Sequence, residues 1–367
     1  MGKKVKVMVV DDSAVVRQGF DFIIKQLGDI EMVASASNPY IAANKLKKSI
    51  PDVLILDIQM PKMDGITFLK KLMRQHPLPV IICSSLTESN RKLALDALQA
   101  GAVEVIQKPQ VGVRSYLEES KVVIGDAIRS AAKARVSKKG RSRAQAKAKT
   151  EESKQISTPQ PRHSVHAVIP NGPKDTRRRP LNTDRVILIG ASTGGTLAIE
   201  ILLKQLPANA PAMAIVQHMP GGFTSTFASR LNDLSAMKVR EAQDGDVMKS
   251  GQVLIAPGNT HMVLQRSGTR YYVELQDGPL VSRHRPSVDV LFRSGAVAAG
   301  KNAVGVILTG MGMDGADGMQ DLKEAGARTI AQNKASSTVF GMPGACISRN
   351  IIDDVLSLEQ IPAKIDH

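Results

Sequence analysis

Two short stretches, VKVMVVDD at residues 5–12 and RVILIGASTGG at residues 185–195, indicate the fold of the two halves of the chain. In each, a run of apolar, mostly β-branched residues ends abruptly in acidic residues or in glycine and serine. Such runs are typical of strands buried on both faces of a parallel sheet. Around the first stretch, further apolar runs alternate with helix-like segments at residues 30–36, 53–56, 79–83 and 103–107. This alternation predicts a flavodoxin-like doubly wound domain, with its ligand site at the carboxyl ends of the strands.

The second half of the chain shows the same alternation, with one interruption. Apolar runs at residues 212–217, 303–310 and 328–332 are separated by helix-like segments. In contrast, QVLIAP (252–257) and YYVEL (271–275) follow each other without a long helix between them. We therefore expect a second doubly wound, mainly parallel α/β domain that contains an antiparallel excursion.

The basic charge is concentrated between the two halves. The chain carries a formal net charge of +15, and residues 131–184 hold 14 basic and four acidic side chains with few large apolar ones. This composition predicts a basic flexible linker at 131–184, between domains at 1–130 and 185–367. The chain has no Trp, four Tyr and seven Phe, too few for a platform on which nucleic-acid bases stack. We therefore expect no nucleic-acid binding.

Cysteine content and apolar run length point to the cytoplasm. Cys83 and Cys346 are the only cysteines, and their separation supports neither a disulfide framework nor a thiolate metal site. The N-terminus lacks the pattern of a signal peptide, and no run approaches the roughly 18 apolar residues of a membrane span. We expect a soluble, monomeric cytoplasmic protein without membrane insertion.

Charged and polar residues follow four strands of the first predicted domain. Asp11 and Asp12 follow the first strand, Asp57 ends the third, Ser84 lies past the fourth and Lys108 follows the fifth. In a doubly wound sheet these ends converge on one edge. Three clustered carboxylates repel one another unless a cation lies among them, which predicts Mg²⁺. Asp57 could then act as a nucleophile towards a phosphoryl donor, with Lys108 balancing the charge.

The motifs VDDS, LDIQMPKMDG, SSLT and QKP stand at receiver spacing, and residues 3 to about 125 resemble a two-component response-regulator receiver domain. The resemblance implies that Asp57 accepts a phosphoryl group from a histidine kinase. One departure is Val105, which stands where receivers often carry an aromatic switch residue. The implied contacts are Mg²⁺ with the carboxylates of Asp11, Asp12 and Asp57 and the carbonyl of Gln59, and the phosphoryl group with Ser84 and Lys108.

The second half carries a serine between a predicted strand and helix. Residues 190–194 satisfy G-x-S-x-G, in which glycines allow a sharp turn that exposes the Ser192 hydroxyl. Backbone N–H groups at the helix start, that of Thr193 among them, could stabilise an oxyanion. A dinucleotide-binding loop would need glycine at 192 and an acidic residue after the next strand, where the chain has Gln217 and His218. His218 is therefore a candidate base for acyl transfer.

A third group should orient the imidazole and compensate its charge. Asp314 lies in GMGMDGADG, a glycine-rich loop that follows a predicted strand. Asp289 is the chief rival but falls inside a predicted helix, and Asp317 fits less well. We choose Asp314. The chain order Ser, His, Asp differs from the Ser, Asp, His order of the usual α/β-hydrolases, which indicates a different fold.

With IGASTGG, QHMPGGFT, APGNTHM, HRPSVDVLF and LTGMGMDGADGM in the same order, residues 185 to about 350 resemble the catalytic domain of the chemotaxis protein-glutamate methylesterases (CheB type), which are also receptor glutamine deamidases. The resemblance implies a Ser192, His218 and Asp314 triad, with the Met311 N–H in the oxyanion hole. It implies methyl-accepting chemoreceptors as substrates and no cofactor in this half. It also implies that the receiver covers the Ser192 cleft until Asp57 is phosphorylated.

Two other classes of protein compete with this hypothesis. A response regulator with a transcriptional output would need a compact helix-turn-helix unit with a basic face. Residues 185–367 net only +1, are too long for one such unit and follow a βα pattern. A pseudoenzyme that keeps the fold as a scaffold is the other alternative, against which the presence of all three candidate triad residues argues.

Overall fold

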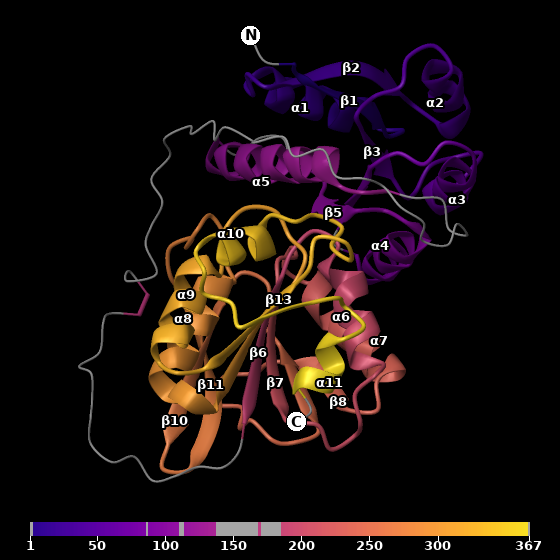
Figure 1. Cartoon of the computed structure of the whole chain (residues 1–367). Helices are drawn as coiled ribbons and strands as arrows, with labels where there is room; N and C mark the ends of the chain where they lie inside the picture. The colour runs from indigo at the N-terminus through magenta and orange to yellow at the C-terminus, as the bar shows by residue number, and fades with distance from the viewer. Residues whose placement is uncertain (1–2, 86, 110–113, 137–167, 170–184, 366–367) are drawn as a thin grey trace.

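The computed structural model describes residues 3–85, 87–109, 114–136, 168–169 and 185–365. These residues form two α/β domains that pack against each other, as Figure 1 shows. We call the part up to residue 136 the N-terminal domain and the part from residue 185 the C-terminal domain. Within the described residues, no helix is both long and apolar enough to cross a membrane.

The N-terminal domain is a five-stranded parallel sheet in the order β2-β1-β3-β4-β5. This is the flavodoxin-like order, so the predicted fold class is confirmed. Both faces of the sheet are covered by helices, and β3 and β4 are buried along their whole length. The elements are β1 (Val5–Val10), α1 (Ala14–Lys25), β2 (Ile30–Ala36), α2 (Pro39–Leu46), β3 (Val53–Asp57), α3 (Gly65–Gln75), β4 (Val80–Ser84), α4 (Glu88–Ala100), β5 (Glu104–Gln107) and α5 (Arg114–Lys133).

The C-terminal domain is built on a seven-stranded parallel sheet in the order β14-β13-β12-β6-β7-β9-β8. A separate antiparallel pair, β10 and β11, supplies the predicted excursion. The fold is therefore mainly parallel α/β, as expected. The strands are β6 (Val186–Ala191), β7 (Ala212–Gln217), β8 (Lys238–Glu241), β9 (Gln252–Ile255), β10 (His261–Ser267), β11 (Arg270–Gln276), β12 (Ala303–Ile307), β13 (Arg328–Gln332) and β14 (Asp354–Leu356).

The antiparallel excursion is smaller than the sequence indicated. The QVLI run forms β9, which pairs in parallel with β7 and β8 inside the main sheet. The partner of β11 is instead β10, whose residues lack a long apolar run. The mixed composition of β10 follows from its position, because its first four residues are buried and its last three are more exposed.

Order reversal in the C-terminal sheet defines where a site can form. From β6 the chain forms β7, then the edge strand β8, and then β9 between them, all on one side of β6; after the β10–β11 pair it returns to β12 on the other side of β6. The carboxyl ends of β6 and β12 therefore flank a topological switch point, where open α/β sheets bind ligands. The helices of this domain are α6 (Gly195–Leu203), α7 (Phe223–Leu234), α8 (Val288–Ala298), the 3₁₀ helix η2 (Gly300–Asn302), α9 (Ala316–Glu324), α10 (Met342–Ser348) and α11 (Ile361–Ile365).

The two domains meet through α4, β5 and α5 of the N-terminal domain. Helix α4 packs on α6 and α7, and the end of α5 lies above the loops at the carboxyl edge of the C-terminal sheet. Helix α5 runs to Lys133, three residues past the predicted domain boundary, and the backbone N–H of Arg135 donates to the carbonyl of Thr338. Most of the predicted linker, residues 137–167 and 170–184, lies outside the described residues.

Candidate active site and phosphorylation site

Ser192 lies on the turn between β6 and α6, at the switch point of the C-terminal sheet. Its backbone N–H donates to the carbonyl of Thr309, in the loop after β12, and its own carbonyl accepts from the N–H of Gly195. The residue is 7% exposed. The turn thus holds the serine between the two strands that flank the switch point.

Two glycines allow this turn to form where it does. Gly194 has a φ of 78°, in the left-handed region, and a Cβ there would lie 2.5 Å from the Thr338 side chain. Gly310 approaches the serine so closely that a Cβ on it would lie 2.8 Å from the Ser192 Cβ. The glycine-rich loop after β12 therefore packs directly against the Ser192 turn. Met311 is the residue that follows Gly310 in this loop.

His218 follows β7 and is bound to Asp314. The His218 Nε2 and the Asp314 Oδ2 lie 2.8 Å apart, and both side chains are almost fully buried. The Nδ1 of His218 is also buried and has no hydrogen-bond partner in the part of the chain that the structure describes. No hydrogen bond joins the Ser192 hydroxyl to His218 among the described residues. Gln217 couples the two loops, because its side-chain amide donates to the carbonyls of both Ser192 and His218.

Asp314 is held as a carboxylate by several donors. It accepts hydrogen bonds from the Ser287 hydroxyl and from the backbone N–H groups of Val288 and Asp289, at the start of α8. Burial alone would raise its pKa, but the hydrogen bond and charge of His218 together with these donors hold the pKa below its usual value. A charged carboxylate facing the imidazole is suited to orient it and to balance a positive charge on it.

Asp289, the alternative candidate for the acid that orients His218, makes different contacts. Its Oδ1 accepts from the backbone N–H groups of Gly315, Asp317 and Gly318, at the start of α9, and its Oδ2 accepts from the Ser282 hydroxyl. Burial and the neighbouring Asp314 raise its pKa. Asp289 thus fastens the loop that carries Asp314, and does not contact His218. Asp317 points elsewhere and pairs with Arg349.

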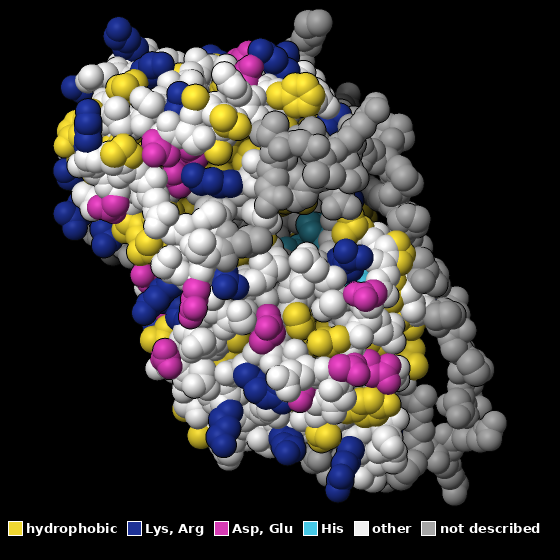
Figure 2. All heavy atoms as spheres, turned by 180° about the vertical axis from the view of Figure 1, so that it is seen from behind, with side chains coloured by type: hydrophobic (Ala, Val, Ile, Leu, Met, Phe, Trp, Pro, Cys, Tyr) yellow, Lys and Arg dark blue, Asp and Glu magenta, His cyan; other side chains and the backbone are white. Residues whose placement is uncertain are grey.

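The N-terminal domain contacts the residue next to Ser192. The Thr193 hydroxyl donates to the Glu104 carboxylate of β5 at 2.7 Å and accepts from the Ser130 hydroxyl of α5 at 2.5 Å. Burial raises the pKa of Glu104 to about 7, against the hydrogen bond from Thr193 and the charge of His218. Figure 2 shows histidine side chains in a hollow between the two domains.

Further contacts continue the interface along α4. Arg91 donates to the carbonyl of Gly222, in the QHMPGGFT motif, at 2.7 Å. Asp96 pairs with Arg230 of α7 at 2.9 Å, and Gln99 donates to Glu200 of α6 at 2.7 Å. These polar contacts frame Leu95 and Leu98, which are buried in a cluster that includes side chains of both domains. The interface is therefore apolar at its centre and polar at its rim.

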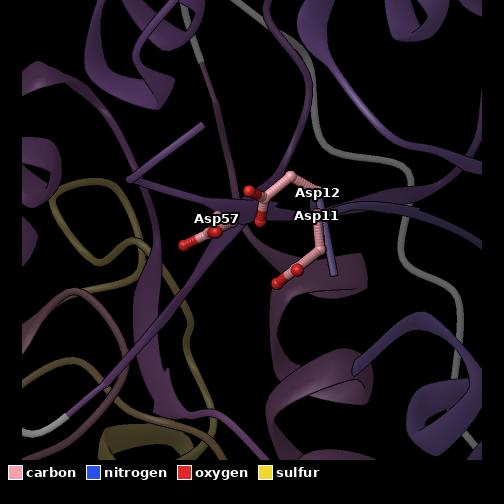
Figure 3. Close-up of side chains that lie close together, drawn as sticks. All are labelled: Asp11, Asp12 and Asp57. Carbon is pink, nitrogen blue, oxygen red and sulfur yellow. The ribbon is translucent and has the colours of Figure 1, made fainter. Parts of the chain in front are cut away.

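The second site lies in the N-terminal domain, where three carboxylates gather at the ends of β1 and β3. Figure 3 shows Asp11, Asp12 and Asp57 close together, and one oxygen of each lies within 4.8 Å of the others. Asp11 and Asp57 are buried, whereas Asp12 is exposed. The Lys108 Nζ lies 2.7 Å from Asp57 Oδ2 and 3.0 Å from Asp11 Oδ2. The predicted convergence of these four side chains is therefore what the structure shows.

The charge of this cluster suits a hard cation. Burial and repulsion from Asp11 raise the pKa of Asp57, although Lys108 opposes the shift, and Asp11 Oδ2 has no partner with hydrogen-bond geometry. A cavity of about 420 Å³ beside the cluster is lined in part by Asp12 and Gln59. Oxygen ligands around an open position are the set that Mg²⁺ prefers. The residues present fit this ion.

Ser84 and Gln59 make other hydrogen bonds in this structure than the contacts predicted for them with the phosphoryl group and Mg²⁺. The Ser84 hydroxyl donates to the carbonyls of Ser85 and Asn90, and no hydrogen bond joins it to Asp57 among the described residues. Gln59 contacts Asp57 through its backbone N–H, at 3.3 Å. Ser84 is buried beside Lys108, whose backbone N–H donates to the Ser84 carbonyl.

Sequence reasoning missed several residues around Ser192. Gln217 ends a strand that is otherwise apolar, and this lone amide was a usable signal. His284 and Ser287 lie within HRPSVDVLF, a motif that the sequence analysis noted without giving either residue a role. His284 stacks on His218 with ring centroids 3.7 Å apart. Glu104 carries no local signal, because its role depends on the packing of a separate domain.

Comparison with known proteins identifies the family of both domains. Residues 187–365 match the family model "CheB methylesterase", and residues 7–117 match "Response regulator receiver domain". A protein-glutamate methylesterase/protein-glutamine glutaminase of Geobacter metallireducens is 51% identical over 99% of this chain and 98% of its own length. One of Rhizobium johnstonii is 50% identical over 100% of this chain and 98% of its own.

A solved structure covers the C-terminal half. The CheB methylesterase catalytic domain of Thermotoga maritima is 37% identical, covers 50% of this chain and 97% of its own, and superposes with a TM-score of 0.49. The full-length relatives carry the family assignment, because they align with both domains. The chain therefore belongs to the family of receiver-containing protein-glutamate methylesterases/protein-glutamine glutaminases.

Proposed function

We propose that this chain hydrolyses the methyl esters of glutamate side chains on chemoreceptors, and deamidates glutamines there, by Ser192, His218 and Asp314 catalysis. The observation that carries the proposal is the buried His218–Asp314 pair beside the Ser192 turn, with the second imidazole nitrogen unpartnered. A base oriented by a carboxylate, with its free nitrogen near a serine, is the arrangement that acyl transfer requires.

The first half of the reaction forms an acyl-enzyme. Because Nε2 of His218 faces Asp314, Nδ1 is the atom that takes the proton from Ser192 as its Oγ attacks the ester carbonyl. The carbon–oxygen bond to the methoxy group then breaks, and the imidazolium returns its proton to give methanol. A glutamine substrate follows the same course, with ammonia as the leaving group.

The second half restores the enzyme. Water adds to the glutamyl–serine ester while His218 takes a proton, and the free glutamate leaves as the proton returns to Ser192. The negative charge on the carbonyl oxygen needs donors at each step. The backbone N–H groups of Thr193 and Met311 are our candidates, since one follows the serine and the other follows the glycine packed on it.

We assign regulation to the N-terminal domain. Glu104 and Ser130 hold Thr193, and Arg91 holds the carbonyl of Gly222, so a docked N-terminal domain restricts access to Ser192. Asp57 is the proposed acceptor of a phosphoryl group from a histidine kinase. Phosphorylation there would weaken the docking and admit a receptor helix.

The proposed Mg²⁺ ligands are Asp11, Asp12, Asp57 and the carbonyl of Gln59. When bound, the ion would neutralise charge between the carboxylates and the incoming phosphoryl group. Lys108 holds the carboxylate of Asp57 in place and balances part of its charge, and Ser84 would have to turn from its present carbonyl partners to contact the phosphoryl group.

Substitution of the proposed nucleophile tests the enzymatic function. Ser192→Ala should lower methanol release from methylated receptors by roughly 10³-fold or more, because the remaining groups cannot form the acyl-enzyme. Ser348→Ala, an exposed serine on α10, is the matched control and should retain normal turnover. Near-normal methanol release by Ser192→Ala would remove this residue from the mechanism.

A further inference from the structure

A second histidine lies flat against the proposed catalytic base. The rings of His284 and His218 have centroids 3.7 Å apart and planes only 11° from parallel. At this separation the two rings are in van der Waals contact over their faces, so neither can tilt without displacing the other. Asp314 fixes one edge of the His218 ring through Nε2, and His284 covers one face.

The backbone that carries His284 adopts an unusual conformation. Val281 and His284 exchange both backbone hydrogen bonds, at 2.9 and 3.1 Å, and so close a two-residue turn. The two central residues, Ser282 and Arg283, have φ values of 51° and 72°. Neither is glycine, and this left-handed conformation is unfavourable for an L-amino acid because its Cβ lies too close to the following carbonyl oxygen. Such strain persists only where the surroundings hold the turn in place.

Contacts on both central residues hold this turn. The Ser282 hydroxyl donates to Asp289, the carboxylate that also fastens the Asp314 loop. The Arg283 guanidinium pairs with Asp126, on α5 of the N-terminal domain, at 3.3 Å. The turn is therefore tied to the loop of the proposed triad acid by a contact within the C-terminal domain, which does not depend on docking, and in the docked structure to the N-terminal domain as well.

The electrostatics suit a neutral ring at this place. Burial lowers the pKa of His284 to about 3, and the charges of His218 and Arg283 act in the same direction, while Asp314 opposes them. A neutral imidazole can lie against His218 without repelling the positive charge that His218 acquires when it takes the serine proton. It also keeps water from one face of the base.

We propose that His284 is a positioning residue that holds the plane of the His218 ring so that Nδ1 faces Ser192, and that the strained 281–284 turn supplies its position. This inference rests on the proposed function. It adds that the flat contact, and not an acid–base property of His284, is what matters. A different flat, uncharged ring at position 284 should therefore also hold the plane of the His218 ring.

Three substitutions at one position test this inference in the full-length protein, phosphorylated with acetyl phosphate. His284→Ala should lower kcat for methanol release by roughly 10- to 100-fold, with KM changed less than about threefold, because orientation and not substrate binding is lost. The acid limb of the kcat/KM profile should move to higher pH, because water then solvates the charged imidazole. His284→Phe should recover most of kcat, and His284→Leu should recover less.

Two controls separate this role from a merely structural one. Leu280→Ala changes an exposed residue, 40% accessible, just before the same turn, and should leave kcat and the pH profile unchanged. The rate of Ser192 labelling by a fluorophosphonate probe should follow kcat across the series, measured below the Tm of each variant.

Either of two results would overturn the inference: a His284→Ala enzyme with kcat within twofold of wild type, or a His284→Phe enzyme as slow as His284→Ala at equal Tm. Ser192→Ala distinguishes this failure from failure of the proposed function. If Ser192→Ala is inactive and His284→Ala is not impaired, only the positioning role is wrong. If Ser192→Ala retains turnover, the proposed function itself is wrong.

Discussion

The two candidate sites occupy the same place in two related folds, yet they differ in what surrounds them. Both lie at the carboxyl ends of parallel strands, and in both a buried carboxylate contacts a basic side chain, Asp57 with Lys108 and Asp314 with His218. The Asp57 site opens onto a cavity and includes the exposed Asp12. At the Ser192 site, the neighbouring Thr193 is bound by Glu104 of the N-terminal domain. If the proposed function holds, accessibility more than chemistry would separate a site open to a small phosphodonor from one that takes a protein substrate.

The largest effect should come from the carboxylate of the Ser192 site. Asp314→Asn keeps the shape but replaces the acceptor that faces His218 Nε2, and the lost orientation and charge compensation should lower kcat by roughly 10³- to 10⁴-fold. Methanol release measures the change. Asp317→Asn, in the first turn of α9, is the control and should retain activity, because that side chain is exposed and pairs with Arg349. Similar losses in both variants would contradict the assignment.

Deletion of the N-terminal domain should produce the second largest change in the rate of ester hydrolysis. A chain without residues 1–136 should hydrolyse receptor esters about 5- to 150-fold faster than the unphosphorylated full-length protein, which corresponds to a coupling of about 1–3 kcal/mol. The comparison needs equal labelling by a fluorophosphonate, which counts competent active sites. A truncated enzyme no faster than the full chain would argue against occlusion.

A charge exchange controls for damage by truncation. Arg230→Glu places like charges at the contact with Asp96, and should raise the unphosphorylated activity several-fold. The double variant Asp96→Arg with Arg230→Glu restores opposite charges, and should return activity towards the wild-type value. An equal gain in the single and double variants would show that this contact does not restrain the enzyme.

The Asp57 site should determine only whether a phosphodonor stimulates activity at the Ser192 site, and not the basal activity. Asp57→Asn removes the proposed phosphoryl acceptor, so acetyl phosphate should no longer stimulate methanol release, and activity should stay within about twofold of the basal rate. Chelation of Mg²⁺ with EDTA should have the same result in the wild type, because the ion is needed for phosphorylation and not for ester hydrolysis. Asp21→Asn, on α1, should respond normally.

The smallest expected effect concerns pH and the contact between the domains. Burial in the docked structure raises the pKa of Glu104 from its usual 4.5 to about 7, so if undocking exposes this side chain, the docked form holds the proton more tightly. The contribution of Glu104 to docking is complete below pH 4.5, and is lost as the pH rises through 7. The unphosphorylated wild type should therefore gain several-fold in activity between pH 6 and 8, beyond any change in Glu104→Gln. Parallel profiles for the two proteins, with exposed Glu359→Gln as the control, would exclude this coupling.

Much of the fold was predictable because it depends on local patterns. Strands such as VLIL and RVILIG are continuous apolar runs, and buried parallel sheets require them. Strands β8, β10 and β14 were not predicted, because their mixed composition reflects partial exposure in the sheet. The sequence could not show that QVLI joins the main sheet and that β10 pairs with β11, because an apolar run indicates burial and does not say which strand is its partner.

The sites were predictable to the extent that strand ends determine them. Asp11, Asp57 and Lys108 converge because parallel strands end at one edge, and the same rule pointed to Ser192, His218 and Asp314. Contacts that depend on packing between distant segments left no pattern. The stack of His284 on His218 requires a left-handed turn, and the contact of Glu104 with Thr193 requires two domains to dock.

The contact of Glu104 and Ser130 with Thr193 has a consequence for how inhibition scales with concentration. A docked domain and an incoming receptor would compete for one surface, but the domain belongs to the same chain as the serine. Dilution of the enzyme therefore leaves the strength of this competitor unchanged, whereas dilution of the receptor weakens its rival. A high local concentration of receptors would favour the undocked form by mass action alone. Phosphorylation of Asp57 would lower the receptor concentration that is needed.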